Sequence, residues 1–180
     1  MKTVGKRRMA REMALQMLYQ HDLGGSAPAQ IFGVFDRSVY LSGLTGLSGN
    51  GSEDDEEGAK RRRAPKRTPE EGERRRREVD EAFDYARSLV EGTLGHLDEC
   101  NRLISEQADN WRLERMPAVD RNILRLAVYE LLYEADIPKL VVVDEAIELA
   151  KKFSTDQSSR FVNGLLDGLL KRREFPGTLK

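Results

Sequence analysis

The residue types in this sequence that are best suited to chemistry are basic and aromatic, and the first of two such clusters lies near the N-terminus. Its members are Lys6, Arg7, Arg8, Arg11, Gln16 and Tyr19. At about 100° per helical residue, Tyr19 shares a face with Arg8 and Gln16, opposite an apolar stripe. Basic residues hold phosphates and a ring stacks on a base for about 1–3 kcal/mol, which predicts a contact with single-stranded nucleic acid. The alternative is that Tyr19 is a singly exposed aromatic residue.

A second cluster of the same residue types lies near the C-terminus, in the segment KKFSTDQSSRF. Lys152 precedes a predicted loop, and Arg160 and Phe161 follow it. We predict that Ser158 is the N-cap of the last helix, which leaves free backbone amides beside Arg160 and Phe161. A helix start next to an arginine and a ring suits a phosphate and a base. The alternative is that Phe161 is a core residue. We expect the two clusters to lie on the same side of the molecule.

The overall charge of the chain is close to zero, with 30 Lys and Arg against 31 Asp and Glu. Any attraction to nucleic acid therefore depends on local clusters of basic residues. The single cysteine, Cys100, has no partner for an internal disulfide, which suits a reducing compartment. No apolar run approaches the length of a signal peptide core or the roughly 20 residues of a membrane span. These features predict a cytoplasmic protein without a membrane segment.

The sequence offers little for catalysis. His21 and His96 fall on separate predicted helices, and neither has a second ligand at metal-binding spacing. Cys100 lies on an apolar stripe, which favours a buried, inert thiol. Glu130 falls inside another apolar stripe, where an unpaired carboxylate would be costly, so we predict that it has a partner or lies at the edge of the stripe. We therefore predict no catalytic residues, no metal and no cofactor.

Apolar residues recur at helical spacing along most of the chain, and strand signals are nearly absent. The pattern predicts an all-α fold of about seven helices. A weak helix is expected over 28–41, Thr68 is expected to cap the next helix, and the β-branched run at 140–146 is interpreted as the start of another. The segment 42–67 is rich in Gly and Ser with an acidic and then a basic block, which predicts disorder.

Three segments closely resemble the NusB family: RRMAREMALQMLYQHDL, ARSLVEGTL and the stretch from NWRLERMPAVDRN to FVNGLLDGLL. The resemblance covers about 5–24 and 80–171 and is most specific over 110–170. It implies one all-helical domain over 1–180, with an N-terminal subdomain at about 5–95 and a C-terminal subdomain at about 96–172. The charged segment at about 42–67 would interrupt the first subdomain between its second and third helices.

This resemblance also implies a function. Members of the family are RNA-binding transcription antitermination factors that bind the boxA element of ribosomal RNA leader transcripts together with NusE, a small-ribosomal-subunit protein. The complex joins RNA polymerase in an antitermination assembly. The RNA contacts that the resemblance implies on this chain are Lys6, Arg7, Arg8, Arg11, Gln16, Tyr19, Gln157, Ser158 and Phe161. Lys152 and Arg160 of the second cluster complete the predicted RNA-binding residues. The implied NusE surface lies around Asp120 and Tyr129. Some relatives self-associate, and the sequence leaves a homodimer open.

The chain departs from the family pattern in two places. The stretch 42–77 is longer and more charged than the usual link, and it contains ten Lys and Arg residues. We interpret it as a solvated tether, with an auxiliary RNA-binding arm as the alternative. Gln157 stands where many relatives carry an acid. Two other functions stay open: the N-terminal domain of a ribosomal RNA cytosine methyltransferase, if the chain is a fragment, and a protein-interaction adapter that does not bind RNA.

Overall fold

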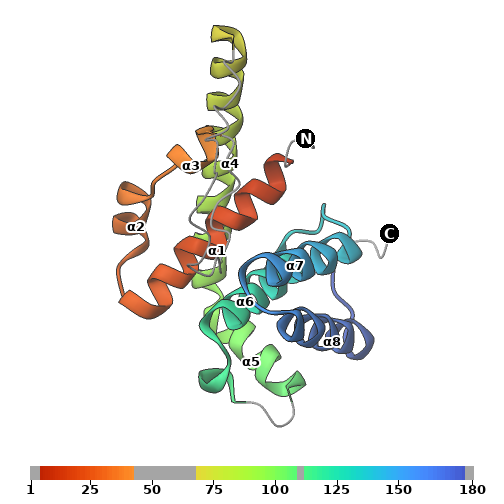
Figure 1. The fold of residues 1–180 in the computed structure, drawn as a ribbon. Helices are drawn as coiled ribbons and strands as arrows, with labels where there is room; N and C mark the ends of the chain where they lie inside the picture. The colour runs from red at the N-terminus through yellow and green to blue at the C-terminus, as the bar shows by residue number, and fades with distance from the viewer. Residues whose placement is uncertain (1–4, 43–67, 109–111, 177–180) are drawn as a thin grey trace, which may run out of the picture.

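The computed structural model describes residues 5–42, 68–108 and 112–176, and all regular structure within them is helical (Figure 1). The helices are α1 (Lys6–Gly24), α2 (Pro28–Val34), α3 (Ser38–Ser42), α4 (Pro69–Gly95), α5 (Leu97–Gln107), the 3-10 turn η1 (Leu113–Arg115), α6 (Ala118–Tyr133), α7 (Lys139–Phe153) and α8 (Asp156–Arg172). The all-α prediction is confirmed over these ranges. Ser42, the first residue of the segment 42–67 that was predicted to be disordered, is instead the last residue of α3, and 43–67 lies outside the described residues.

Helix α1 packs against both α4 and α6, so it links the two ends of the fold (Figure 1). Its predicted apolar stripe is fully buried, as Met13, Ala14 and Leu18 show. Burial extends beyond the stripe to Arg11, which was expected to contact RNA, and to Glu12. The reason is that neighbouring helices cover more than one side of α1.

The single weak helix predicted over 28–41 is two short helices, α2 and α3. Phe35 is extended, with φ −66° and ψ 119°, and so ends α2. The carboxylate of Asp36 accepts hydrogen bonds from the backbone N–H of Ser38 at 2.8 Å and from its hydroxyl at 3.0 Å. A side chain that satisfies a free amide in this way starts a new helix, and this explains the break.

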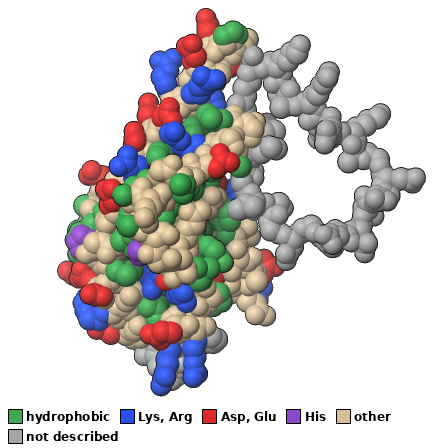
Figure 2. Space-filling view, turned by 90° about the vertical axis from the view of Figure 1, so that its left-hand side faces the viewer, with side chains coloured by type: hydrophobic (Ala, Val, Ile, Leu, Met, Phe, Trp, Pro, Cys, Tyr) green, Lys and Arg blue, Asp and Glu red, His purple; other side chains and the backbone are tan. Residues whose placement is uncertain are grey.

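Helix α4 begins as predicted with a capping box. The Thr68 hydroxyl accepts from the N–H of Glu71 at 3.2 Å, and the Glu71 carboxylate accepts from the N–H of Thr68 at 2.9 Å. Val79 is the first buried residue of α4, and the turns before it project beyond the other helices (Figure 1). Basic and acidic side chains are interspersed over this end of the molecule (Figure 2). Arg74 and Arg75 both reach Glu78, at 3.7 and 3.5 Å.

The C-terminal helices are arranged around α6, which contacts α1, α4, α5, α7 and α8. Ile123, Leu124 and Leu131 of α6 are buried in the same hydrophobic cluster as the stripe of α1. The β-branched run before Ala146 is helical, as predicted, and buries Val142 and Val143. The proposed division into two subdomains stays a prediction.

A polar network fastens the C-terminal end of α1 to α6. The Asp22 carboxylate accepts from Arg121 at 2.6 Å, from Arg125 at 2.9 Å and from Asn122 at 3.0 Å. Burial opposes the charge of Asp22, but the hydrogen bonds from the two arginines outweigh it and hold the pKa of Asp22 below its usual 3.8. This network therefore favours the ionised carboxylate.

Candidate nucleic-acid interface

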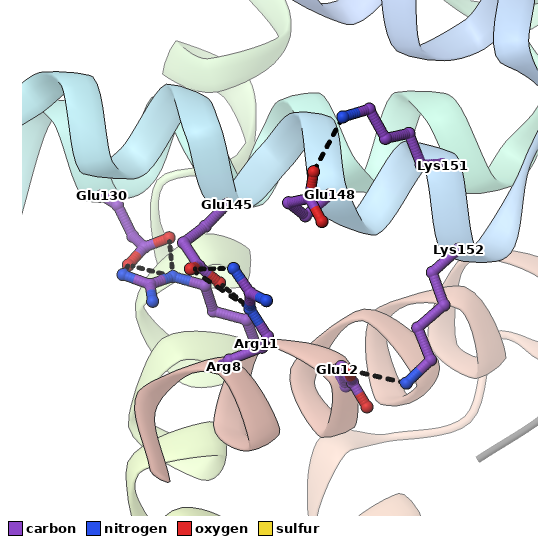
Figure 3. Close-up of polar contacts among 8 residues, drawn as sticks. All are labelled: Arg8, Arg11, Glu12, Glu130, Glu145, Glu148, Lys151 and Lys152. Atoms are coloured by element: carbon purple, nitrogen blue, oxygen red, sulfur yellow. Dashed lines mark hydrogen bonds and ion pairs between the residues drawn. The ribbon is translucent and has the colours of Figure 1, made fainter. Parts of the chain in front are cut away.

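An ion pair joins α1, which carries the N-terminal cluster, to α7, which carries Lys152 of the second cluster. The other predicted residues of the second cluster lie on α8. The ammonium group of Lys152, near the end of α7, donates to the carboxylate of Glu12 on α1 at 2.7 Å (Figure 3). Arg8 and Tyr19 lie on the same face of α1 as Glu12, since positions 8, 12 and 19 fall within about 40° of one another at helical spacing. The contact therefore places the end of α7 beside the face of α1 that we predicted to bind nucleic acid.

Arg8 forms a second link between α1 and α7. Its Nε and Nη2 atoms donate to the carboxylate of Glu145 at distances of 2.7 to 3.2 Å (Figure 3). The Arg8 side chain is 41% exposed, whereas that of Glu145 is only 15% exposed. The hydrogen bonds that Arg8 donates to Glu145 outweigh burial and raise the pKa of Arg8. Arg8 is thus a fixed, permanently charged group at the surface.

Tyr19 is 38% exposed, so its ring reaches solvent as the spacing predicted. Gln16, on the same side of α1, is half-buried, and its Nε2 donates to the Tyr40 hydroxyl of α3 at 2.8 Å. Arg7 is exposed, and exposed Lys6 pairs with Glu81 of α4. The N-terminal cluster therefore presents Lys6, Arg7, Arg8 and Tyr19 to solvent, with Gln16 turned towards α3.

Arg11 corrects the prediction for this cluster. Its side chain is 2% exposed and donates to Glu130 of α6 at 3.0, 3.0 and 2.7 Å (Figure 3). A guanidinium enclosed in this way cannot meet a phosphate, so Arg11 is a structural residue. The same contact confirms the predicted partner for Glu130. Burial raises the pKa of Glu130, and the hydrogen bonds from Arg11 oppose this rise.

The start of α8 differs from its prediction by one turn. Thr155, not Ser158, is the N-cap, and its hydroxyl accepts from the N–H of Ser158 at 3.2 Å. Thr155 takes this role because its backbone is extended, with φ −115° and ψ 165°. The Ser158 hydroxyl is buried and hydrogen-bonded to Ser154 at 2.8 Å and to Thr155 at 3.0 Å. The Ser158 side chain is therefore enclosed within the cap.

The other predicted residues of this cluster reach the surface to different extents. Gln157 and Arg160 are exposed on the first turns of α8. Phe161 is half-buried and packs against the hydrophobic core. It is therefore neither a fully exposed ring nor a fully buried core residue, the two alternatives that the sequence left open. Lys152 is 27% exposed, and its ammonium lies 5.2 Å from the centre of the Phe153 ring. This cation–π contact is a further restraint on the Lys152 head group.

The predicted partner surface around Asp120 and Tyr129 is only partly accessible. Asp120 is 3% exposed, and its Oδ1 has no hydrogen-bond partner among the described residues. A buried carboxylate cannot be the centre of a docking surface, so the expectation for Asp120 is wrong. Tyr129 is half-buried and stacks on Tyr133, with ring centres 5.4 Å apart, while His96 lies 4.0 Å from Tyr133. Tyr133 is 44% exposed, and the sequence analysis did not identify it.

The cysteine and histidine side chains considered for catalysis or metal binding are buried or lie apart from other such groups. Cys100 is fully buried, and burial raises the pKa of its thiol to about 12. His21 Nδ1 lies 2.8 Å from the Ser26 carbonyl oxygen, a structural hydrogen bond. Among the described residues, His, Cys, Asp and Glu form no group of three that could hold a metal ion. No described helix combines the length and hydrophobicity needed to span a bilayer.

The sequence analysis missed the acidic residues that fix the cations of this surface. Glu12 follows Arg8 by four residues, and Glu145 precedes Lys152 by seven, so each helix carries an acid and a base on one face. This pairing of opposite charges was the available signal. It did not identify the contacts, because it could equally describe two separate, solvated helix faces.

Comparison with known proteins places the chain in a family. The sequence profile of the NusB family matches residues 36–171. The chain is 42% identical to the transcription antitermination protein NusB of Symbiobacterium thermophilum over 165 residues, which is 92% of this chain and 89% of the relative. It is 39% identical to NusB of Myxococcus xanthus over 164 residues, 91% of this chain and 94% of the relative. These relatives are named as antitermination proteins and not as enzymes.

Solved structures agree with this assignment. T. maritima NusB has a TM-score of 0.64 at 30% identity and covers 96% of this chain and 94% of its own. A complex of the antitermination factors NusB and NusE with double-stranded RNA shares the fold, with a TM-score of 0.64 at 24% identity and coverage of 93% and 98%. The extent of these matches, in sequence and in fold, shows that the chain belongs to the NusB family of transcription antitermination proteins.

Proposed function

We propose that this chain is an RNA-binding antitermination factor that recognises the boxA element of ribosomal leader transcripts together with NusE. The NusB relatives and the solved complex of NusB, NusE and RNA support this function. The observation that carries it is the contact between Lys152 and Glu12, which brings Lys152 of the second cluster to the helix that carries the first. The complex would then join the RNA polymerase antitermination assembly in the bacterial cytoplasm.

In the proposed mechanism, the basic and the aromatic side chains of this surface contact different parts of the RNA. Basic side chains contact phosphates, which supply most of the salt-dependent affinity, and rings engage unstacked bases. Tyr19 and Phe161 provide the rings; Tyr19 is exposed and Phe161 is half-buried. Gln157 and the first turn of α8 contact the strand beside Phe161. The proposed phosphate ligands are Lys6, Arg7, Arg8, Lys152 and Arg160.

NusE is proposed to dock on the C-terminal helices beside the ring cluster of His96, Tyr129 and Tyr133. Aromatic side chains are enriched at protein interfaces, and Tyr133 is exposed among the carboxylates of α5 and α6. Its hydroxyl donates to Glu99 at 2.6 Å. A basic ribosomal protein complements this arrangement of rings and acids.

Fluorescence anisotropy with labelled boxA RNA, with and without NusE, tests the proposal. We expect the chain to bind boxA RNA more tightly than a scrambled strand of equal length, and NusE to strengthen the binding. An absence of RNA binding in both arms would favour the protein-interaction adapter. The high coverage of relatives named NusB already favours an antitermination factor over a methyltransferase domain.

A further inference from the structure

Two ion pairs connect α1 and α7, and in both the acid is more deeply buried than the base. The Glu12 side chain is 4% exposed and that of Lys152 is 27% exposed. For the second pair the values are 15% for Glu145 and 41% for Arg8. The carboxylates are therefore the more buried partners, while the cations they hold reach the surface.

This difference in burial decides how the cations can respond to RNA. If Lys152 left Glu12 for a phosphate, a nearly buried carboxylate would lose its partner, and such a charge is costly. Lys152 has three N–H donors and uses one on Glu12, so it can keep that bond and still donate to a phosphate. Arg8 uses Nε and Nη2 on Glu145 and keeps the donors of Nη1.

We infer that Glu12 and Glu145 are positioning residues of the RNA site, which hold Lys152 and Arg8 in place to contact phosphates of one strand. This inference rests on the proposed RNA-binding function. Arg8 and Glu12 are four residues apart, so the two ion pairs are separated by about 6 Å along α1. Cations held in this way lose little side-chain freedom on binding, which favours affinity.

The inference predicts that removing either glutamate weakens RNA binding, which is the opposite of the usual effect of removing a negative charge. Removing a negative charge from an anion-binding surface ordinarily strengthens binding, because repulsion is reduced. If Glu12 and Glu145 position the cations, replacing them by glutamine weakens RNA binding, since the neutral amide holds the cation less well. The two accounts therefore differ in the direction of the change.

The test uses the full chain and boxA RNA over a series of salt concentrations, with the variants Glu12→Gln and Glu145→Gln. We expect each to weaken binding about tenfold, the equivalent of one charge-assisted hydrogen bond. The slope of log affinity against log salt should become shallower by about 0.7, because one phosphate fewer is neutralised by the protein. Asp144→Asn is the matched control, because Asp144 is an exposed acid on the same helix, and this variant should bind as well as the wild type or slightly better.

A double-mutant cycle separates positioning from a purely structural role. If Glu12 acts through Lys152, then Glu12→Gln combined with Lys152→Met should bind no worse than Lys152→Met alone. Thermal unfolding identifies any variant that does not fold, in which case the Glu145→Gln and Arg8→Met pair serves the same purpose. Unchanged or tighter binding by folded Glu12→Gln and Glu145→Gln would overturn the inference. Failure of the wild-type chain to bind boxA RNA would instead overturn the proposed function and the inference with it.

Discussion

Arg11 of α1 and Glu130 of α6 form a buried ion pair in which both side chains are 2% exposed. Breaking such a pair leaves one charge without a partner, whereas replacing both residues by apolar ones removes the problem. We predict that Glu130→Ala lowers the free energy of unfolding by about 3–5 kcal/mol and that the double variant Arg11→Met, Glu130→Met recovers most of this loss. Urea denaturation measures both. A loss of about 1 kcal/mol or less for Glu130→Ala, as for an exposed pair, would contradict the prediction.

Tyr19→Ala should weaken binding to boxA RNA while the fold stays intact. The ring is exposed, so its removal leaves no cavity, and base stacking on an aromatic side chain contributes about 1–3 kcal/mol, or about 5- to 150-fold in affinity. Anisotropy titrations measure the affinity, and circular dichroism checks the fold. Leu140→Ala, an exposed apolar residue in the first turn of α7, is the control. Equal affinities for the two variants would remove Tyr19 from the site.

The lowered pKa of Asp22 predicts a pH dependence of stability. A carboxyl group whose pKa is lower in the folded state stabilises the fold above its unfolded pKa of about 3.9, and this stabilisation is lost as the pH falls through the folded value. The difference in unfolding free energy between wild type and Asp22→Asn should therefore shrink as the pH falls from about 6 to below 4. Urea denaturation at several pH values measures it. A difference that stays constant over this range would show that Arg121 and Arg125 do not depend on the Asp22 charge.

Deletion of residues 42–66 should leave the salt dependence of RNA binding unchanged, as expected for a tether. If the segment did bind phosphates of a single strand, its deletion would make the slope shallower by about 0.7 for each of them. Lys152→Met is the positive control, for which the slope should change. A similar change in the deletion variant would identify the segment as a second RNA-binding arm.

The apolar periodicity was sufficient to predict the helices, because each amphipathic pattern has one dominant buried face. Thr68 was predictable as a cap, since a proline and acids follow it directly. Ser158 was not, because Thr155 lies three residues earlier and has an equally suitable hydroxyl. A sequence that offers two capping residues one turn apart does not determine where the helix begins.

The burial of charged residues of α1 could not be predicted from the sequence either. A helical wheel assumes one buried face, so charged residues away from the stripe were interpreted as solvated. Arg11 and Glu12 are buried because α6 and α7 bring Glu130 and Lys152 to them from more than 100 residues away. Glu130 could be predicted to need a partner, but the identity of that partner depends on packing that no local pattern contains.

The central position of α1 limits how this protein can change during evolution. Nine of its nineteen residues are buried, whereas Lys6, Arg7 and Tyr19 are among those that face outward. New ligand preferences must therefore arise at the outward positions or on α8, since mutations at the buried positions of α1 would be selected against for loss of folding. Adaptation to a different transcript is for this reason more readily accommodated by α8 than by the first helix.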